Sequence, residues 1–252
     1  MPDQIEQRVL GAIRLLDRAT NNIVQRPLSL SANDAKFIRN RSNLYVITEA
    51  LGLEHHITVF EEPPLNPAIE SIDIDIEITD PLGRYLPRIT RISLPRNANP
   101  DNSETIDSLF QPINVALYAS ANAPVLNNWS TIRASVTRDD PENGRVPVRG
   151  SLLRVIRISN DEVLASGLSD ERGEVLVLIP GVPITRFADE DDAEDSVEVS
   201  ELPVRLEVSY GGSDVWPVNT DVLENTHNDN FQLSQNLSLK TGRMEKTIIE
   251  LT

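Results

Sequence analysis

The chain has 252 residues, of which 23 are Lys or Arg and 39 are Asp or Glu, so its formal net charge is −16. It contains no cysteine, which excludes a disulfide framework, a thiolate nucleophile and a thiolate metal site. The negative charge argues against nucleic acid or anionic lipid as the main partner, because both bind positively charged surfaces.

The N-terminal segment carries no recognisable targeting signal. Its apolar residues are interrupted by Arg8, Arg14 and Asp17, and no basic region precedes an apolar core. No stretch of the chain approaches the length of about 18 apolar residues that a membrane-spanning helix needs. We therefore expect a protein that is made in the cytoplasm without a signal peptide and does not insert into a membrane. A part of a particle released by lysis would carry the same features.

Residues 5–16 fit either a helix or a strand. Ile5, Val9 and Ile13 recur at helical spacing, whereas Val9, Gly11 and Ile13 recur at strand spacing. We favour a strand that begins at about Val9.

The clearest strand follows at Ser71–Thr79, where polar and apolar residues alternate. Four isoleucines fall on one face and carboxylates on the other, which is typical of a half-buried antiparallel strand. The turn signal Asp80-Pro81-Leu82-Gly83 follows, and a second strand at Arg88–Leu94 stops at Pro95. Together these segments predict a hairpin.

Further strands are indicated at short intervals along the rest of the chain, separated by prolines and by clusters of Asn, Asp and Gly. They are Leu28–Leu30, Leu44–Thr48, Ile57–Phe60, Ile113–Ala119, Thr131–Thr137, Leu152–Ile158, Val175–Ile179, Val204–Tyr210 and Lys246–Leu251. This spacing is typical of all-β sandwiches or barrels. The sequence therefore predicts an all-β protein.

A domain boundary is indicated at residues 120–128, which are small and polar and include one proline. We therefore expect two consecutive antiparallel β-sandwich domains, at residues 1–125 and 126–252. The first holds 11 basic and 16 acidic residues (11 − 16 = −5) and the second holds 12 and 23 (12 − 23 = −11). Most of the negative charge thus belongs to the second domain.

The most biased segment is an acidic loop at residues 188–201. From Asp189 to Glu201 it holds eight acidic residues and no basic one, so it should repel itself and remain an extended loop. A calcium loop is the alternative, but the spacing of carboxylates is irregular and no glycine occupies the required turn position. A solvated loop, or one that meets a basic partner surface, is favoured.

The segment Gly150–Pro180 resembles the carboxypeptidase-regulatory-like, or transthyretin-like, β-sandwich domain. Two strands are followed by a Ser169-Asp170-x-x-Gly173-Glu174 turn and a final strand at Val175–Ile179. Gly173 supplies the permissive backbone of a tight turn, and Asp170 can accept hydrogen bonds from turn amides. The resemblance implies that the second domain is transthyretin-like, a fold that says little about function.

Four motifs in order resemble a family of carboxypeptidase-regulatory-like proteins associated with phage-tail-like contractile injection systems. They are Arg8–Arg14, Arg39–Val46, Asp80–Arg88 and Leu94–Arg96. The resemblance implies a structural component of the particle, in a cap or another terminal layer. It implies sheath, tube or cap proteins as partners and a homo-oligomeric ring, and it brings no catalytic residue, cofactor or metal site.

The sequence offers only weak candidates for a catalytic or metal-binding site. His55 and His56 would point to opposite faces of a strand, so they form a poor metal site, and a solvated loop before a strand at Ile57–Phe60 is favoured. No Gly-x-Ser-x-Gly elbow, P-loop or Gly-x-Gly-x-x-Gly motif occurs. We therefore expect no catalytic residue, no cofactor and no metal.

The candidate interaction residues are arginines of the first domain, acids of the second and one tryptophan. They are Arg84, Arg88, Arg91, Arg96, Asp189, Glu190, Asp191, Asp192, Glu194, Asp195 and Trp216. In a ring, the arginines of one subunit would meet the acidic loop of the next, and Trp216, in a turn, would be an exposed anchor. The alternative, that these are unrelated surface charges, stays open.

The primary hypothesis is thus a non-enzymatic structural component of a contractile injection particle. The second is a ligand-binding or calcium-binding adhesin-like β-sandwich module. The third is a hydrolase that uses a carboxylate pair or a His/Glu metal site, and the sequence supports it least.

Overall fold

The computed structural model describes residues 9–58, 72–182, 185–186, 198–199, 201–212 and 215–251. Its elements are nearly all strands, accompanied by two short α-helices and one 3-10 turn, η1 (Pro100–Asn102). The prediction of an all-β protein is confirmed. None of the helices in these residues has the length and apolar character needed to cross a membrane.

The chain divides into two compact units. The first consists of Met1–Asp17, Asn21–Pro81 and Pro87–Leu117, and the second of Arg18–Thr20, Leu82–Leu86 and Tyr118–Thr252. The sequence indicated a boundary after residue 125, whereas the last crossing between the units follows Leu117. Composition indicates a single linear boundary, so it could not show that two short early segments group with the second unit.

The first unit contains two sheets. One has the strand order β3-β4-β1-β7 and comprises β3 (Ala35–Arg39), β4 (Leu44–Ala50), β1 (Gly11–Asp17) and β7 (Ile113–Leu117). The other has the order β2-β5-β6 and comprises β2 (Ser29–Ser31), β5 (Ile72–Thr79) and β6 (Arg88–Leu94). All pairs are antiparallel except β1 with β7, which run parallel. The strand expected from about Val9 is confirmed as β1.

The predicted hairpin is the β5–β6 pair, in which Ile74 lies opposite Ile92 and Asp75 opposite Arg91. The isoleucines of β5 face inward while its carboxylates are exposed, as the alternation indicated. A Cβ atom on Gly11 of β1 would lie 3.3 Å from Leu94 of β6, so the two sheets pack face to face.

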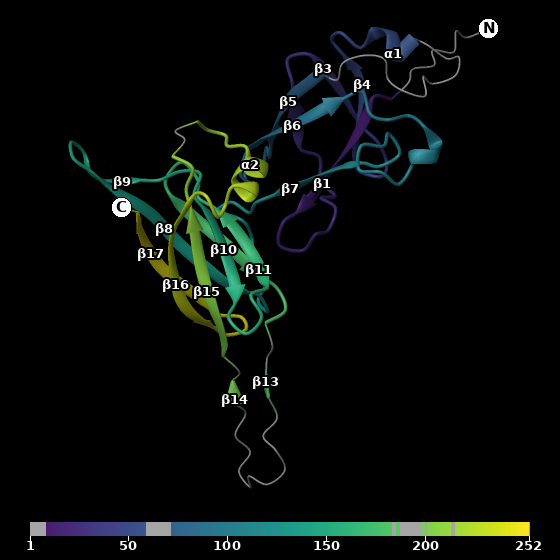
Figure 1. Cartoon of the computed structure of the whole chain (residues 1–252). Helices are drawn as coiled ribbons and strands as arrows, with labels where there is room; N and C mark the ends of the chain where they lie inside the picture. The colour runs from purple at the N-terminus through teal and green to yellow at the C-terminus, as the bar shows by residue number, and fades with distance from the viewer. Residues whose placement is uncertain are drawn as a thin grey trace. The chain divides into compact units, whose positions relative to one another are not determined.

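The second unit is also a two-sheet sandwich. One sheet has the order β11-β10-β15-β16 and comprises β11 (Val163–Leu168), β10 (Leu152–Arg157), β15 (Leu202–Ser209) and β16 (Phe231–Leu239), which lie side by side in Figure 1. The other has the order β12-β8-β17, with β9 also on β8, and comprises β12 (Glu174–Ile179), β8 (Ser130–Asp140), β17 (Met244–Leu251) and β9 (Gly144–Pro147). Among the described strands of this unit, only β8 and β17 pair in parallel. A short pair links β13 (Thr185–Arg186) and β14 (Glu198–Val199).

The core of the second unit is built from inward-facing residues of both sheets. Val136 and Val177 from one sheet and Val155 and Leu206 from the other belong to one buried cluster. Gly167 of β11 lies where the sheets approach closely, since a Cβ atom there would come within 2.7 Å of Val177. The sandwich therefore depends on a small residue at this point.

The strands expected within Gly150–Pro180 are present as β10, β11 and β12. Asp170 accepts hydrogen bonds from the backbone N–H groups of Arg172 and Glu174, both at 2.9 Å, as expected. Gly173 adopts φ +75°, and a Cβ atom there would lie 2.4 Å from the Val136 carbonyl oxygen. The turn does not close a hairpin, because β11 and β12 belong to opposite sheets. It is a corner of the sandwich.

One local prediction was wrong, because Ile57 lies in helix α1 (Glu54–Thr58) rather than in a strand. The polar segment 219–230 contains helix α2 (Thr220–Asn225), whose N-cap Asn219 accepts from the N–H groups of Asp221 and Val222. An N-cap offsets the low apolar content of a short helix by satisfying its first amides.

Candidate functional site

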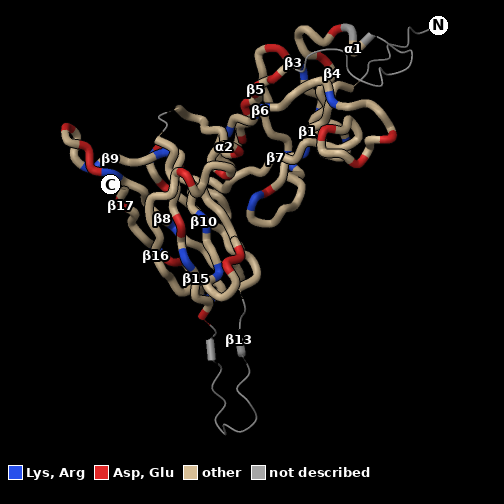
Figure 2. Tube along the Cα trace, in the orientation of Figure 1, with Lys and Arg blue, Asp and Glu red and all other residues tan. Residues whose placement is uncertain are grey.

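The four candidate arginines do not form one basic surface. Arg84 belongs to the second unit, whereas Arg88, Arg91 and Arg96 belong to the first. In Figure 2 the basic positions are scattered along the trace of each unit. Spacing in the sequence alone therefore overstated how closely these side chains gather.

Arg88 is a buried side chain, 2% exposed, and its guanidinium donates to the carbonyl oxygen of Ala116 on β7. Its inclusion in an exposed patch was wrong, because alternation along β6 turns it inward with Ile92 and Leu94. Arg91 turns outward, as expected for a residue three positions on. Its Nε and Nη2 atoms donate to both carboxylate oxygens of Asp75, at 2.7 and 2.8 Å.

The pKa values of these groups follow their contacts. The hydrogen bonds from Arg91 hold the pKa of Asp75 below its usual value. Burial lowers the pKa of Arg96, whose guanidinium donates to the carbonyl oxygen of Ile106. Of the four arginines, Arg84 and Arg91 are the exposed ones, and Arg91 already binds an acid of its own chain.

The acidic residues Asp189, Glu190, Asp191, Asp192, Glu194 and Asp195 lie outside the described residues. Trp216, expected to be an exposed anchor, is half-buried and packs against a cluster formed by Leu86, Leu168 and Val218, among others. Trp129 packs against the buried side chains of Leu176 and Leu178. Among the described contact residues of the second unit, Arg84 is exposed and Trp216 is half-buried.

The histidine pair lies at the start of α1, so the expected strand geometry does not apply. Within the part of the chain that the structure describes, no group of three or more His, Cys, Asp or Glu side chains is arranged to hold a metal ion. His227 is buried and hydrogen-bonded, as described below.

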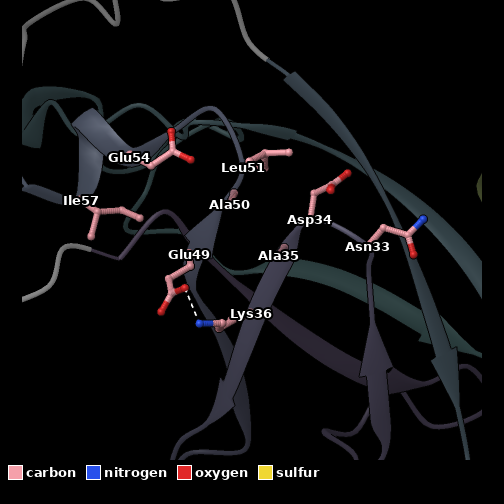
Figure 3. Close-up of a pocket in the computed structure, with 9 residues that line it drawn as sticks. All are labelled: Asn33, Asp34, Ala35, Lys36, Glu49, Ala50, Leu51, Glu54 and Ile57. Atoms are coloured by element: carbon pink, nitrogen blue, oxygen red, sulfur yellow. Dashed lines mark ion pairs between the residues drawn. The ribbon is translucent and has the colours of Figure 1, made fainter.

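An open depression of about 490 Å³ lies in the first unit beside β3 and β4, and Figure 3 shows its lining. It is bordered by Asn33, Asp34, Ala35, Lys36, Glu49, Ala50, Leu51, Glu54 and Ile57. Lys36 and Glu49 form an exposed ion pair at 2.6 Å, and Glu54 accepts a hydrogen bond from the N–H of Gly52. An exposed pair of this kind contributes little to stability, because water screens both charges.

A polar cluster lies where α2 covers the outer face of β10 and β15. We call it the α2 polar cluster, and its members are Arg18, Tyr118, Arg154, Glu207, Ser209, Glu224 and His227. Alternation along β15 places Glu207 and Ser209 on this outer face, while Val204, Leu206 and Val208 face the core. All seven residues belong to the second unit.

Glu224 is the centre of one half of the cluster. Its carboxylate accepts from Tyr118 Oη, from Arg18 Nη2 at 3.0 Å and from Arg154 Nε at 3.2 Å. Arg154 Nη2 also donates to the Glu224 carbonyl oxygen at 2.8 Å. Burial raises the pKa of Glu224, but the hydrogen bonds and the two arginine charges outweigh burial, so its pKa lies below the usual value.

His227 is the centre of the other half. Its Nδ1 lies 2.8 Å from Ser209 Oγ, and its Nε2 lies 3.2 Å from Glu207 Oε2. Glu207 also accepts from Arg205 Nε at 2.8 Å. Burial raises the pKa of Glu207, but the hydrogen bonds from Arg205 and His227 lower it by more. The pKa of Glu207 therefore lies below its usual value.

A serine, a histidine and a carboxylate in this order have the residue types of a nucleophilic triad. A working triad must let a substrate carbonyl approach the hydroxyl. Here Ser209 is 0% exposed and His227 is 2% exposed, so the hydroxyl is closed off by the fold. The cluster is suited to fixing α2 on the sheet, and its partners, 18 and 20 residues apart, left no signal in the sequence.

Comparisons with known proteins give no family. No protein-family profile matches the chain, and no curated protein matches its sequence. Among solved structures, the TIE protein of Bacillus anthracis aligns with 97% of this chain at 7% identity and a TM-score of 0.27, and the chain spans about a third (34%) of that protein. The minor pilin GBS52 of Streptococcus agalactiae aligns with 96% of this chain at 8% identity and a TM-score of 0.29, over 95% of the pilin. Similarity at this level carries no argument about function.

Proposed function

We propose that this chain is a structural, non-catalytic subunit that acts through protein–protein contacts in a larger assembly. The observation that carries the proposal is the closure of the α2 polar cluster. The residues best suited to chemistry, Ser209 and His227, are sealed inside the second unit and hold α2 in place. Buried polar groups with satisfied partners rigidify a fold, which suits a building block.

The finer proposal is that the assembly is a phage-tail-like contractile injection particle, with this chain in a cap or another terminal layer. It is supported by the order of the motifs Arg8–Arg14, Arg39–Val46, Asp80–Arg88 and Leu94–Arg96. The sandwich corner at Asp170 and Gly173 also has the geometry expected from the carboxypeptidase-regulatory-like resemblance. Sheath, tube or cap proteins would be its partners, in a homo-oligomeric ring.

A contact between the arginines and the acidic loop of a neighbouring subunit remains part of this proposal in a reduced form. Arg88 drops out because it is buried. Arg84 and Arg91 remain exposed, so they are the arginines to test. Reversing the charge of both arginines should weaken ring formation. The effect should be smaller at high salt, because salt screens exposed ion pairs in the wild-type ring as well.

The experiment is co-purification from cells that produce the particle. An affinity-tagged full-length chain should retain sheath, tube or cap proteins through washing, and light scattering after size exclusion should show more than one copy. A tagged chain carrying Lys36→Glu, which alters an exposed pair away from Arg84 and Arg91, is the matched control. A stable monomer that is absent from purified particles would overturn the proposal.

A further inference from the structure

Strand β17 is the end strand of its sheet. It pairs with β8, and in the part of the chain that the structure describes no strand pairs with its other edge. An end strand exposes a row of backbone N–H and C=O groups that can pair with another chain. β9 does not cover this edge, because Arg138 of β8 pairs with Val146 of β9 on one side and with Leu251 of β17 on the other.

The direction of the backbone groups on β17 follows from one hydrogen bond. The carbonyl oxygen of Arg243, just before the strand, accepts from the N–H of Thr131 on β8 at 3.0 Å. Backbone groups of successive residues point to opposite edges of a strand. The odd-numbered residues of β17 therefore direct their backbone N–H and C=O groups to β8. The even-numbered residues direct theirs to the free edge.

The same even-numbered residues carry the exposed side chains. Met244, Lys246, Ile248 and Glu250 are exposed, whereas Ile249 and Leu251 are buried. Ile248 is 64% exposed, which is unusual for a large aliphatic side chain at mid-strand. A cation thus stands two residues before the exposed isoleucine and an anion two residues after it.

This pattern is self-complementary in one antiparallel register. When two copies of β17 pair about a two-fold axis at Ile248, isoleucine meets isoleucine and each Lys246 lies opposite a Glu250. Side chains directly opposite across strands are close enough to interact. A two-fold axis at Lys246 would place two lysines opposite each other, and an axis at Glu250 would place two glutamates opposite each other. An axis at residue 247 or 249 would place Ile248 opposite a charged side chain. Only the axis at Ile248 satisfies every pair.

We propose that the free edge of β17 is a docking site for a second copy of this chain, paired antiparallel about Ile248. The contact is isologous, with the same strand on both sides. Glu250 already contacts Arg145 of its own chain, and both side chains remain about half exposed, so a partner lysine can join that pair from the free edge. A single strand pair buries little surface, so the dimer should be weak, with a Kd in the micromolar range or above.

The test is analytical ultracentrifugation of the full-length protein over a concentration series, with Lys246→Glu and Glu250→Lys variants. Each variant places like charges opposite each other and should weaken self-association by about tenfold or more. A mixture of the two variants restores both opposite-charge pairs, so the mixture should associate when neither variant does alone. The Ile248→Lys variant would place two lysines opposite each other at the axis, so it should also remain monomeric.

A wild-type protein that stays monomeric up to about 1 mM, where even a Kd of that size would be seen, would overturn the proposal. Variants that dimerise as the wild type does, or a mixture that fails to associate, would overturn it as well. Far-UV circular dichroism checks that each variant is folded. The inference does not rest on the proposed role in a particle: loss of this dimer leaves particle association to be decided by co-purification.

Discussion

His227 Nδ1 and Ser209 Oγ lie 2.8 Å apart, and both side chains are buried in the second unit. The other ring nitrogen contacts Glu207 at 3.2 Å. The imidazole therefore links β15 to the turn after α2. Its surroundings make it a structural residue of the second unit.

Replacing Ser209 with alanine should destabilise the protein by about 1–2 kcal/mol, because His227 Nδ1 would remain buried without its hydroxyl partner. Urea unfolding measures this change. Ser234→Ala, on the exposed side of β16, is the matched control and should alter stability by less than about 0.5 kcal/mol. Equal effects of the two substitutions would contradict the buried hydrogen bond.

Replacing Glu224 with glutamine should cost about 2–4 kcal/mol at neutral pH, because Arg18 and Arg154 would lose their shared counter-charge in a partly buried site. Glu162→Gln, at an exposed pair with Arg157, is the control and should cost less than about 1 kcal/mol. The free energy of unfolding from denaturant titration decides between these outcomes.

The pH dependence of stability tests the same site. The pKa of Glu224 is lower in the folded protein than in the unfolded chain, so the unfolded state binds the proton first as the pH falls. Its contribution is complete above the unfolded value of about 4.3 and is lost as the pH falls through the folded pKa. The Glu224→Gln variant should therefore lose less stability than the wild type between neutral and acid pH. Parallel curves would show that Glu224 titrates normally.

Gly173→Ala should destabilise the second unit strongly. The residue has φ +75°, and the added Cβ atom would lie 2.4 Å from the Val136 carbonyl oxygen. Gly181, with φ +79° and open space around it, isolates the cost of backbone conformation alone. We expect about 1 kcal/mol for Gly181→Ala and at least about 3 kcal/mol for Gly173→Ala. Thermal and urea unfolding of both variants give the comparison.

Substitutions of the two arginines of β6 should destabilise the protein by different amounts, because one side chain is buried and the other is exposed. Arg88→Ala removes a buried side chain that donates to Ala116, so it should cost about 2–4 kcal/mol. Arg91→Ala breaks an exposed pair with Asp75 and should cost less than about 1 kcal/mol. If Arg91 is the more costly of the two, the assignment of inward and outward faces on β6 is wrong.

Periodic segments were predictable from the sequence because each face of a strand leaves its own pattern. The alternation in Ser71–Thr79 predicted the C-terminal end of β5 at Thr79 and its inward-facing isoleucines. Strand β16 was missed because Gln235, Asn236 and Ser238 weaken its apolar pattern, and an end strand needs less burial. Helix α2 was missed because its N-cap contributes through a backbone contact that no apolar period shows.

The α2 polar cluster could not be predicted, because its pairs join residues far apart in the chain. Arg18 and Glu224 are 206 residues apart, and Tyr118 and Glu224 are 106 apart. The burial of Arg88 depends on a carbonyl 28 residues away. A single sequence shows which residues can ionise, whereas their partners are set by the packing of strands.

The structural role is tested most directly by quantitative mass spectrometry of purified contractile particles from a producing strain. We expect the chain to be present at a fixed, multi-copy ratio to sheath and tube proteins through successive purification steps. Its absence from the particles, or a ratio that falls towards zero with each step, would contradict the account.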